Sequence, residues 1–321
     1  MRPARAGDRA AAAALARRCG AAALRGPAQV ALDREGRLLG YVTHGPVDPD
    51  DGWRTVHDPV VDRATLSKAA AARLVERLLG ADPAVGAPPA TRIRYHQRDP
   101  ASPLRGTAAA PGRVPDPILI RAGFTRWLRR LRMEHTLTVT QPPPQGIAWV
   151  TYRPHLDGRF RALFRASFRG SLDRAYARAA EDPATAWAAA RRDAGRAAPH
   201  LWILARTAAG RDVGLCLLDP PGIYPTFVVF YLAVLPSARG HGFGRLLAAE
   251  AVRRAAAAAG RPPRHPLRLT VDLDNLPAVA AYRAAGFHPR QAHTLWLRPA
   301  VVPQEGTPPP PGQAGVATPG L

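Results

Sequence analysis

The chain has 321 residues, 46% of them hydrophobic, and a formal net charge of +21 at pH 7. This length and composition fit a globular protein with two domains, each large enough to bury a core of its own. No apolar run reaches the ~18 residues that a transmembrane helix needs. The two cysteines, Cys19 and Cys216, are too few and too far apart for a disulfide framework or a metal site. We therefore expect a cytoplasmic protein with no membrane partner and no metal.

The strong positive charge raises the hypothesis of a nucleic-acid-binding protein. However, the basic residues are almost all arginine, with Lys68 the only lysine, and they are scattered over both halves of the chain. Together with the abundant Ala, Pro and Gly, they indicate a compositional bias of the whole coding sequence. Nucleic acid is therefore the least favoured partner, although an anionic cofactor would still be attracted.

The first half, residues 1–140, is predicted to alternate between strands and helices. Strands are expected at 1–6, 29–33, 37–43, within 53–62, and at 91–97 and 133–140, and helices at 8–24, 69–79 and 118–122. Residues 141–146 are a proline-rich, extended linker, which places a domain boundary there.

The second half, residues 147–300, repeats this alternation. Strands are expected at 147–152, 201–206, 212–218, 227–236, 267–273 and 291–297, and helices at 157–180, 184–194, 245–259 and 275–285. Residues 301–321 contain too few apolar side chains to fold and are predicted to be a disordered tail. The fold class predicted for the whole chain is α+β (mixed α/β), in two domains.

Three short matches between the halves occur in the same order and indicate an internal duplication. Each pair is predicted to fall in a corresponding place: a hairpin, a helix end and the last strand. The matches are residues 36–40 with 210–214, residues 121–124 with 284–287, and residues 135–137 with 293–295.

A glycine-rich turn, residues 239–244, follows the apolar strand at 227–236 and precedes a helix. Glycines at 240, 242 and 244 let the backbone approach a ligand closely, and the N–H groups at a helix N-terminus favour a phosphate. A tight strand-to-helix turn without a ligand is the alternative interpretation of this pattern.

Two residues on the next helix strengthen the ligand interpretation. Asn275 and Tyr282 lie seven residues apart and therefore on one face of that helix. Taken alone, Asn275 would be a helix cap and Tyr282 a half-buried packing residue. Taken with the glycine turn, the pattern over about residues 147–298 resembles the GNAT acetyltransferase superfamily. The motifs that carry the resemblance, in family order, are Leu232-Ala233-Val234-Leu235-Pro236, the Arg-x-x-Gly-x-Gly turn, Asn275-x-x-Ala278, Tyr282 and Gly286-Phe287.

The resemblance implies a mostly antiparallel mixed sheet, flanked by helices and splayed between the 227–236 and 267–273 strands, with acetyl-CoA in the opening. By this resemblance, the backbone near Leu232 and Val234 pairs with the pantetheine arm, Asn275 bonds the cofactor, and Tyr282 protonates the departing thiolate. A phenol with a pKa of about 10 suits that proton transfer. The pyrophosphate is implied to lie on the backbone amides of Arg239, Gly240, His241, Gly242, Phe243 and Gly244, with Arg239 adding charge.

The general base is less defined, because residues 222–236 contain no acidic side chain. Asp272 alternates with apolar positions in its strand and is the candidate base, against the alternative of a solvated carboxylate at a strand end. Tyr224, Tyr231 and His241 are weaker candidates, with His241 interpreted as a spacer within the turn. A chain of water molecules would also serve.

In the first half, the region from Trp53 to Leu79 contains no glycine where the phosphate turn would lie. We therefore interpret this half as a degenerate GNAT-like copy that does not bind CoA in the family manner and instead supplies a wall of the acceptor site.

The predicted function is transfer of acetyl from acetyl-CoA to a primary amine, on a small molecule or a peptide, by direct attack in a ternary complex. The alternatives are a non-catalytic acyl-CoA-binding regulatory module and, on charge alone, a nucleic-acid-associated protein. The arginine-rich segment 159–196 predicts an anionic or carboxylate-bearing acceptor.

Overall fold

The computed structural model describes residues 1–19, 28–47, 53–56, 59–62, 64–80, 92–98, 114–137, 145–193, 199–221, 226–259 and 265–299. Residues 141–144 of the predicted linker and the predicted tail at 301–321 lie outside these ranges. Among the described helices, none is both long enough and apolar enough to cross a bilayer.

In the first half, the described strands pair in the order β1-β2-β3-β4-β6, and the described helices are α1, α2 and α3. Its helices bury small and branched apolar side chains, as on α2, where Ala71, Val75 and Leu78 recur at helical spacing. Its elements in chain order are β1 (Arg2–Pro3), α1 (Asp8–Cys19), β2 (Ala28–Leu32), β3 (Leu38–Val47), β4 (Trp53–Val56), β5 (Val60–Val61), α2 (Lys68–Gly80), β6 (Arg92–Arg98), α3 (Asp116–Arg121) and β7 (Thr125–His135).

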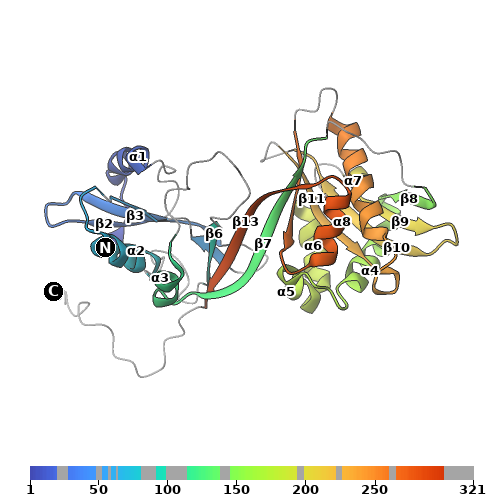
Figure 1. The fold of residues 1–321 in the computed structure, drawn as a ribbon, viewed down its shortest axis with the longest axis horizontal. Coiled ribbons are helices and arrows are strands. Elements are labelled where there is room, and N and C mark those ends of the chain that lie inside the picture. The colour runs from blue at the N-terminus through green and yellow to red at the C-terminus, as the bar shows by residue number, and fades with distance from the viewer. Residues whose placement is uncertain are drawn as a thin grey trace, which may run out of the picture.

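The second half places α7 and α8 on one face of its strands and α4 and α6 on the other (Figure 1). Short 3₁₀ turns connect several of its elements. In chain order the helices and strands are β8 (Ile147–Thr151), α4 (Asp157–Ser167), α5 (Ala177–Glu181), α6 (Pro183–Asp193), β9 (Ile203–Thr207), β10 (Asp212–Asp219), β11 (Phe227–Val234), α7 (Phe243–Ala259), β12 (Leu267–Asp272), α8 (Leu276–Ala284) and β13 (His288–Arg298).

The two halves share one hydrogen-bonded sheet through an exchange of their last strands. The strand order is β1-β2-β3-β4-β6-β13-β7-β12-β11-β10-β9-β8, with β5 paired to β3. Thus β7 of the first half lies between β12 and β13, and β13 of the second half lies between β6 and β7. Figure 1 shows β7 and β13 as two long strands that run side by side from one half to the other. The order is symmetric about this central pair, as a duplication predicts.

The exchanged strands also complete the cores. Leu131 and Met133 on β7 are 5% and 0% exposed and pack in the core beneath α7 and α8. In return, Trp296 on β13 is buried in the core of the first half, where its indole N–H donates to Gln97 Oε1 at 3.0 Å. Each half therefore depends on a strand of the other for its buried surface.

Two predicted elements differ from the structure by more than a few residues. β7 begins at Thr125, eight residues before the predicted strand at 133–140, because its N-terminal part carries arginines that hide the apolar alternation. The predicted helix at 157–180 is interrupted: α4 ends at Ser167, and Gly170 adopts a positive φ of 61°, a conformation that glycine tolerates.

Two of the three internal matches occupy corresponding places. Gly36 and Gly210 sit in hairpins with φ of 80° and 76°, and Gly123 and Gly286 precede β7 and β13 with φ of 85° and 88°. The third match does not correspond, because His135 is the last residue of β7, whereas its counterpart lies in the middle of β13.

His135 is expected to make the fold sensitive to acid. It is 7% exposed, its Nδ1 accepts a hydrogen bond from the Leu137 N–H at 3.0 Å, and burial lowers its pKa, with a further contribution from His288. The unfolded chain, with an ordinary histidine pKa of about 6.5, therefore binds a proton that the folded chain does not. The contribution of His135 to the free energy of unfolding is therefore complete above about pH 6.5. It is lost as the pH falls below this value, by at most about 1.4 kcal/mol per pH unit.

Denaturant unfolding between about pH 8 and pH 5 checks this expectation. His135→Asn keeps an acceptor oxygen for the Leu137 N–H but cannot titrate. Its stability should therefore change less steeply with pH than that of the wild type. Equal slopes in the two proteins would contradict the assignment.

Candidate active site

The sheet opens between β11 and β12. These parallel strands pair only at Phe227 with Leu267 and Val228 with Arg268, after which they diverge. A register shift between Leu217 and Leu218 of β10 marks a bulge in the adjacent β10–β11 ladder, near the point of divergence. Bulges bend and twist the strand that carries them, which directs the end of β11 away from β12.

The divergence leaves part of the β11 edge facing a cavity. The Leu235 N–H bonds Val213 on β10, so by strand alternation the backbone groups of Leu232 and Val234 point the other way, into the opening. The Val234 carbonyl accepts a hydrogen bond from Arg239 Nε at 3.2 Å. The Leu232 N–H and C=O therefore face the cavity at the position that sequence analysis predicts for pairing with a pantetheine arm.

The glycine turn forms one end of this cavity. Gly240 and Gly242 have φ of 81° and 79°, and a Cβ added at either would meet open space. The conformation therefore requires glycine, while the space beside the backbone stays free. α7 begins immediately afterwards at Phe243, and the N–H groups of a first helical turn have no carbonyl of their own helix to bind. Both features suit an anion held by backbone amides.

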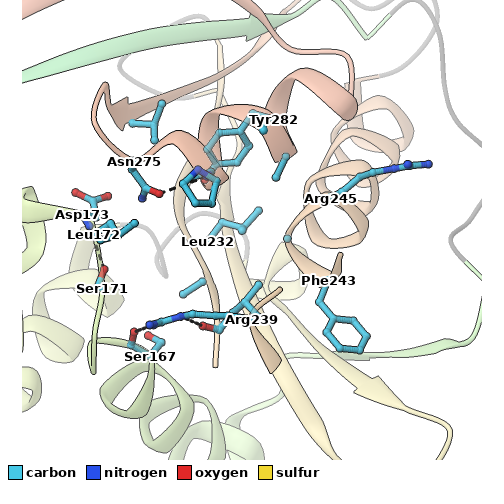
Figure 2. A pocket seen from close by; sticks show the side chains of 18 of the residues that line it. Ser167, Ser171, Leu172, Asp173, Leu232, Arg239, Phe243, Arg245, Asn275 and Tyr282 are labelled. Atoms are coloured by element: carbon cyan, nitrogen blue, oxygen red, sulfur yellow. Dashed lines mark hydrogen bonds between the residues drawn. The ribbon is translucent and has the colours of Figure 1, made fainter. Parts of the chain in front are cut away.

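Arg239 makes three hydrogen bonds to backbone carbonyls. In addition to the bond to Val234, its Nη1 donates to the Gly170 carbonyl at 2.7 Å and its Nη2 to the Ser167 carbonyl at 2.8 Å (Figure 2). It thereby satisfies carbonyls at the C-terminal end of α4 and fixes the following loop to the end of β11. His241 Nδ1 lies 2.8 Å from the Arg239 carbonyl, and its side chain is exposed, as expected for a spacer.

Asn275 and Tyr282 both line the cavity from α8. Asn275 Oδ1 accepts from the Ala278 N–H at 3.3 Å, so the residue is the N-cap of α8 and holds its side chain at the cavity wall. Tyr282 is 8% exposed and packs edge-on against Phe287. Burial raises the pKa of Tyr282, and nearby Cys216 and Asp173 add to the shift, so the phenol stays protonated at neutral pH.

Asp272, the candidate base, is held by other groups of the protein. It is 2% exposed and is not among the described residues that line the cavity. Its Oδ2 accepts from the Arg174 N–H at 2.6 Å, and its Oδ1 lies 3.1 Å from Arg130 Nε on β7. This arrangement favours a positioning role, and the role of Asp272 as a base stays a prediction. Tyr224, a weaker candidate, lies outside the described residues.

The second half matches a family model. Residues 159–287 match the model described as the acetyltransferase (GNAT) family. This segment is a GNAT domain. The segment contains the opening between β11 and β12, the glycine turn, Asn275 and Tyr282. The match does not extend to the first half of the chain.

Solved structures share the fold over most of the chain. A GCN5-related N-acetyltransferase from Sphaerobacter thermophilus is 19% identical, with a TM-score of 0.53 over 85% of this chain and 80% of that one. A tandem GNAT protein from the clavulanic acid biosynthesis pathway is 17% identical, with a TM-score of 0.51 over 87% of this chain and 84% of that one. At these identities the likeness shows the fold alone. No curated protein matches the chain significantly.

In the part of the first half that the structure describes, the parallel pair β4 and β6 stays together where β11 and β12 diverge. β4 pairs in parallel with β6 along all four of its residues, from Trp53 with Arg92 to Val56 with Tyr95. Over these described residues the strands remain paired, whereas β11 and β12 pair at two positions before they diverge. This geometry supports the interpretation of the first half as a degenerate copy.

The cavity in the GNAT domain has a volume of about 600 Å³ and includes residues that sequence analysis did not single out. Arg245, exposed at the start of α7, lines it beside the glycine turn. Ser171, Leu172 and Asp173 line it from the loop after α4. The position of Arg245 directly after Gly244 in the sequence could have indicated that it lies at the site. The loop residues could not be found in this way, because they fall inside the predicted helix at 157–180.

Proposed function

We propose that the chain is an acetyl-CoA-dependent N-acetyltransferase that acts on a primary amine in a ternary complex. The observation that carries the proposal is the cavity that joins the open edge of β11, the positive-φ glycine turn and the buried Tyr282. Within the GNAT domain, the β11 edge can pair with an extended, amide-bearing arm, and the backbone amides of the glycine turn can bind a pyrophosphate. Tyr282 supplies a protonated phenol. The family match supports acyl transfer as the class of reaction.

In the proposed reaction, the amine nitrogen attacks the thioester carbonyl, the C–N bond forms and the C–S bond breaks. The Tyr282 phenol gives its proton to the leaving sulfur, and the proton that the nitrogen loses restores the phenol. A buried, low-dielectric site raises the basicity of the thiolate as well as that of the phenol, so a tyrosine with a raised pKa remains matched to this transfer.

Direct attack is favoured over an acyl-enzyme intermediate because the nearby thiol is poorly suited to be a nucleophile. Cys216 is 0% exposed, and burial raises the pKa of its thiol to about 12. A thiol is nucleophilic as its thiolate and needs access to the substrate. Cys216 has neither thiolate character nor access to the substrate, so we propose that the amine attacks the thioester carbonyl directly.

Calorimetric titration with acetyl-CoA, followed by thiol release with a panel of amines, tests the proposal. We expect one site per chain in the wild type and weaker binding by about 100-fold or more in Gly242→Glu. A carboxylate about 4 Å from a phosphate costs about 4 kcal/mol at an effective dielectric of 20, before screening by salt. Two sites per chain would contradict the interpretation of the first half, and no binding by the wild type would overturn the proposal.

Gly210→Glu is the matched control. Gly210 also has a positive φ, of 76°, with open space at its Cβ, but it lies in the β9–β10 hairpin away from the cavity. It should suffer the same backbone strain and bind acetyl-CoA normally. Binding without thiol release for every amine would favour the second candidate function, a regulatory acyl-CoA-binding module.

A further inference from the structure

The loop after α4 is fixed against the cavity of the GNAT domain. Gly170 gives the loop its sharp turn, and the two hydrogen bonds from Arg239 to the Ser167 and Gly170 carbonyls hold it to β11. Ser171 Oγ then accepts from the Asp173 N–H at 3.2 Å. The loop therefore presents Asp173 to the cavity as part of a built wall.

Asp173 is the only acidic residue among the described residues that line the cavity. Its side chain is 22% exposed, so it is sheltered and still reachable by a ligand. Figure 2 shows it on the side of Asn275, far from Phe243 and Arg245 at the phosphate turn. A molecule that enters beside Asp173 would thus meet the end of the cavity away from the expected phosphates.

Two tyrosines, Tyr231 and Tyr282, line the cavity together with Asp173. Burial is the main cause of the raised pKa of Tyr282, Tyr176 and Tyr231, and Asp173 adds to the shift in all three. The same wall contains Leu172, which is 57% exposed. A carboxylate among aromatic rings and an exposed leucine suits a cation with an apolar body.

The first half of the chain reaches this wall through β7. Arg130 Nε lies 3.1 Å from Asp272 Oδ1, and its Nη2 lies 3.9 Å from Asp173 Oδ1 and donates to the Thr270 carbonyl at 3.3 Å. The other Asp272 oxygen accepts from the backbone N–H of Arg174, the residue next to Asp173. The exchanged strand thus fixes the backbone that carries Asp173.

We propose that Asp173 is the acceptor-binding carboxylate, that it receives a cationic amine without an adjacent carboxylate, and that Arg130 positions it from the first half. This inference rests on the proposed acetyl transfer. The Asp173 carboxylate first takes one proton from the bound ammonium, which frees the nitrogen lone pair for attack. As the C–N bond forms and the C–S bond breaks, Tyr282 protonates the leaving sulfur, and the second proton lost by the nitrogen restores the Tyr282 phenol. The proposal differs from the expectation of an anionic acceptor.

Two of the arginines in the segment 159–196 that led to that expectation form ion pairs outside the cavity. Arg159 pairs with Asp212, and Arg191 lies 3.3 Å from Asp157. Neither is among the cavity-lining residues that the structure describes. A carboxylate beside the reacting amine would instead meet the like charge of Asp173, which disfavours it.

Paired acceptors test the charge rule in the full-length protein. The panel sets tyramine against tyrosine, tryptamine against tryptophan, and putrescine against ornithine, with thiol release from acetyl-CoA as the signal. The wild type should prefer the member without the carboxylate in kcat/KM. Asp173→Asn should raise the KM for that amine about 10-fold to 100-fold, the range of a hydrogen bond to a charged group, and leave the Kd of acetyl-CoA unchanged. It should also lower kcat, because an amide cannot take the proton from the amine.

Two further variants separate charge from structure. Asp173→Glu keeps the carboxylate and should recover part of the lost kcat/KM, whereas Glu181→Gln removes an exposed charge on α5 and should behave as the wild type. A wild-type preference for the carboxylated members, or unchanged kinetics in Asp173→Asn, would overturn the proposal. Turnover with no amine, despite acetyl-CoA binding, would instead overturn the proposed acetyl transfer on which it rests.

The positioning role of Arg130 is tested by measuring both the KM for the amine and the Kd of acetyl-CoA in Arg130 variants. Arg130→Gln should raise the KM for the preferred amine without changing the acetyl-CoA Kd, and Arg130→Lys, which keeps the charge, should be affected less. If Arg130→Gln does not fold, as judged by circular dichroism, the lysine variant carries the test through its KM. Wild-type kinetics in the folded variants would overturn the positioning role.

Discussion

Tyr282→Phe is expected to lower the single-turnover rate of acetyl transfer by about 10²-fold to 10⁴-fold, the usual contribution of a positioned general acid. The substitution removes one hydroxyl and keeps the ring, which is 8% exposed and packs against Phe287. The cavity should therefore keep its shape. The Kd of acetyl-CoA should change by less than about twofold, because phenylalanine keeps the ring that is proposed to contact the pantetheine arm.

The pH profile gives this prediction a second readout. Because burial raises the pKa of Tyr282, the donating form is present across the neutral range, and the wild-type rate should not fall on the alkaline side through this group below about pH 10. Tyr41→Phe is the control, since Tyr41 is also buried, at 1% exposed, but lies in the first half. A Tyr282→Phe variant with the wild-type rate would remove Tyr282 from the mechanism.

The sequence was most informative where local signals and packing agree. The order apolar strand, glycine turn, helix is found in the structure as predicted, because positive φ at Gly240 and Gly242 and the start of α7 are local properties. The opening between the strands was instead an expectation from the family resemblance. The family assignment of the second half is confirmed by the match over residues 159–287. The mixed α/β fold is likewise confirmed by the structures that share it.

The acceptor side was not predictable because it depends on contacts between distant segments. Arg130 and Asp272 are far apart in the sequence and meet because β7 pairs with β12, a pairing that no local pattern signals. Asp173 was concealed for another reason: arginines and alanines with high helix propensity continue past Gly170, so one helix was predicted where a loop forms. The three bonds of Arg239 to carbonyls depend on that same loop.

Dividing the chain between residues 140 and 141 is expected to leave neither part able to fold alone. Without β7, the second part loses Leu131 and Met133 from the core beneath α7 and α8, and the first part without β13 loses buried Trp296. Truncating a single large core side chain typically costs about 2–5 kcal/mol, and a domain has only about 5–15 kcal/mol in total. Removing a whole strand that carries several of them should therefore exceed the available stability.

Co-production of the two parts should restore what each lacks, because the exchanged strands pair with each other and with β6 and β12 across the break. We expect a 1:1 complex with a cooperative thermal transition and acetyl-CoA binding, whereas the separate parts should show neither. A second part that is monomeric, cooperative and competent to bind acetyl-CoA would contradict the exchange.

Single substitutions in the intact chain test the same exchange without cutting it. Met133→Ala, at 0% exposed on β7, should lower the free energy of unfolding by about 2–5 kcal/mol, although the residue belongs to the first half and packs in the second. Ile120→Ala, at 61% exposed on α3, should change it by less than about 0.5 kcal/mol. Because Met133 packs beneath the helices that border the cavity, saturating acetyl-CoA should raise the apparent stability of Met133→Ala, through binding to its folded state. The size of this increase, compared with that of the wild type, reports whether loss of the Met133 side chain weakens acetyl-CoA binding.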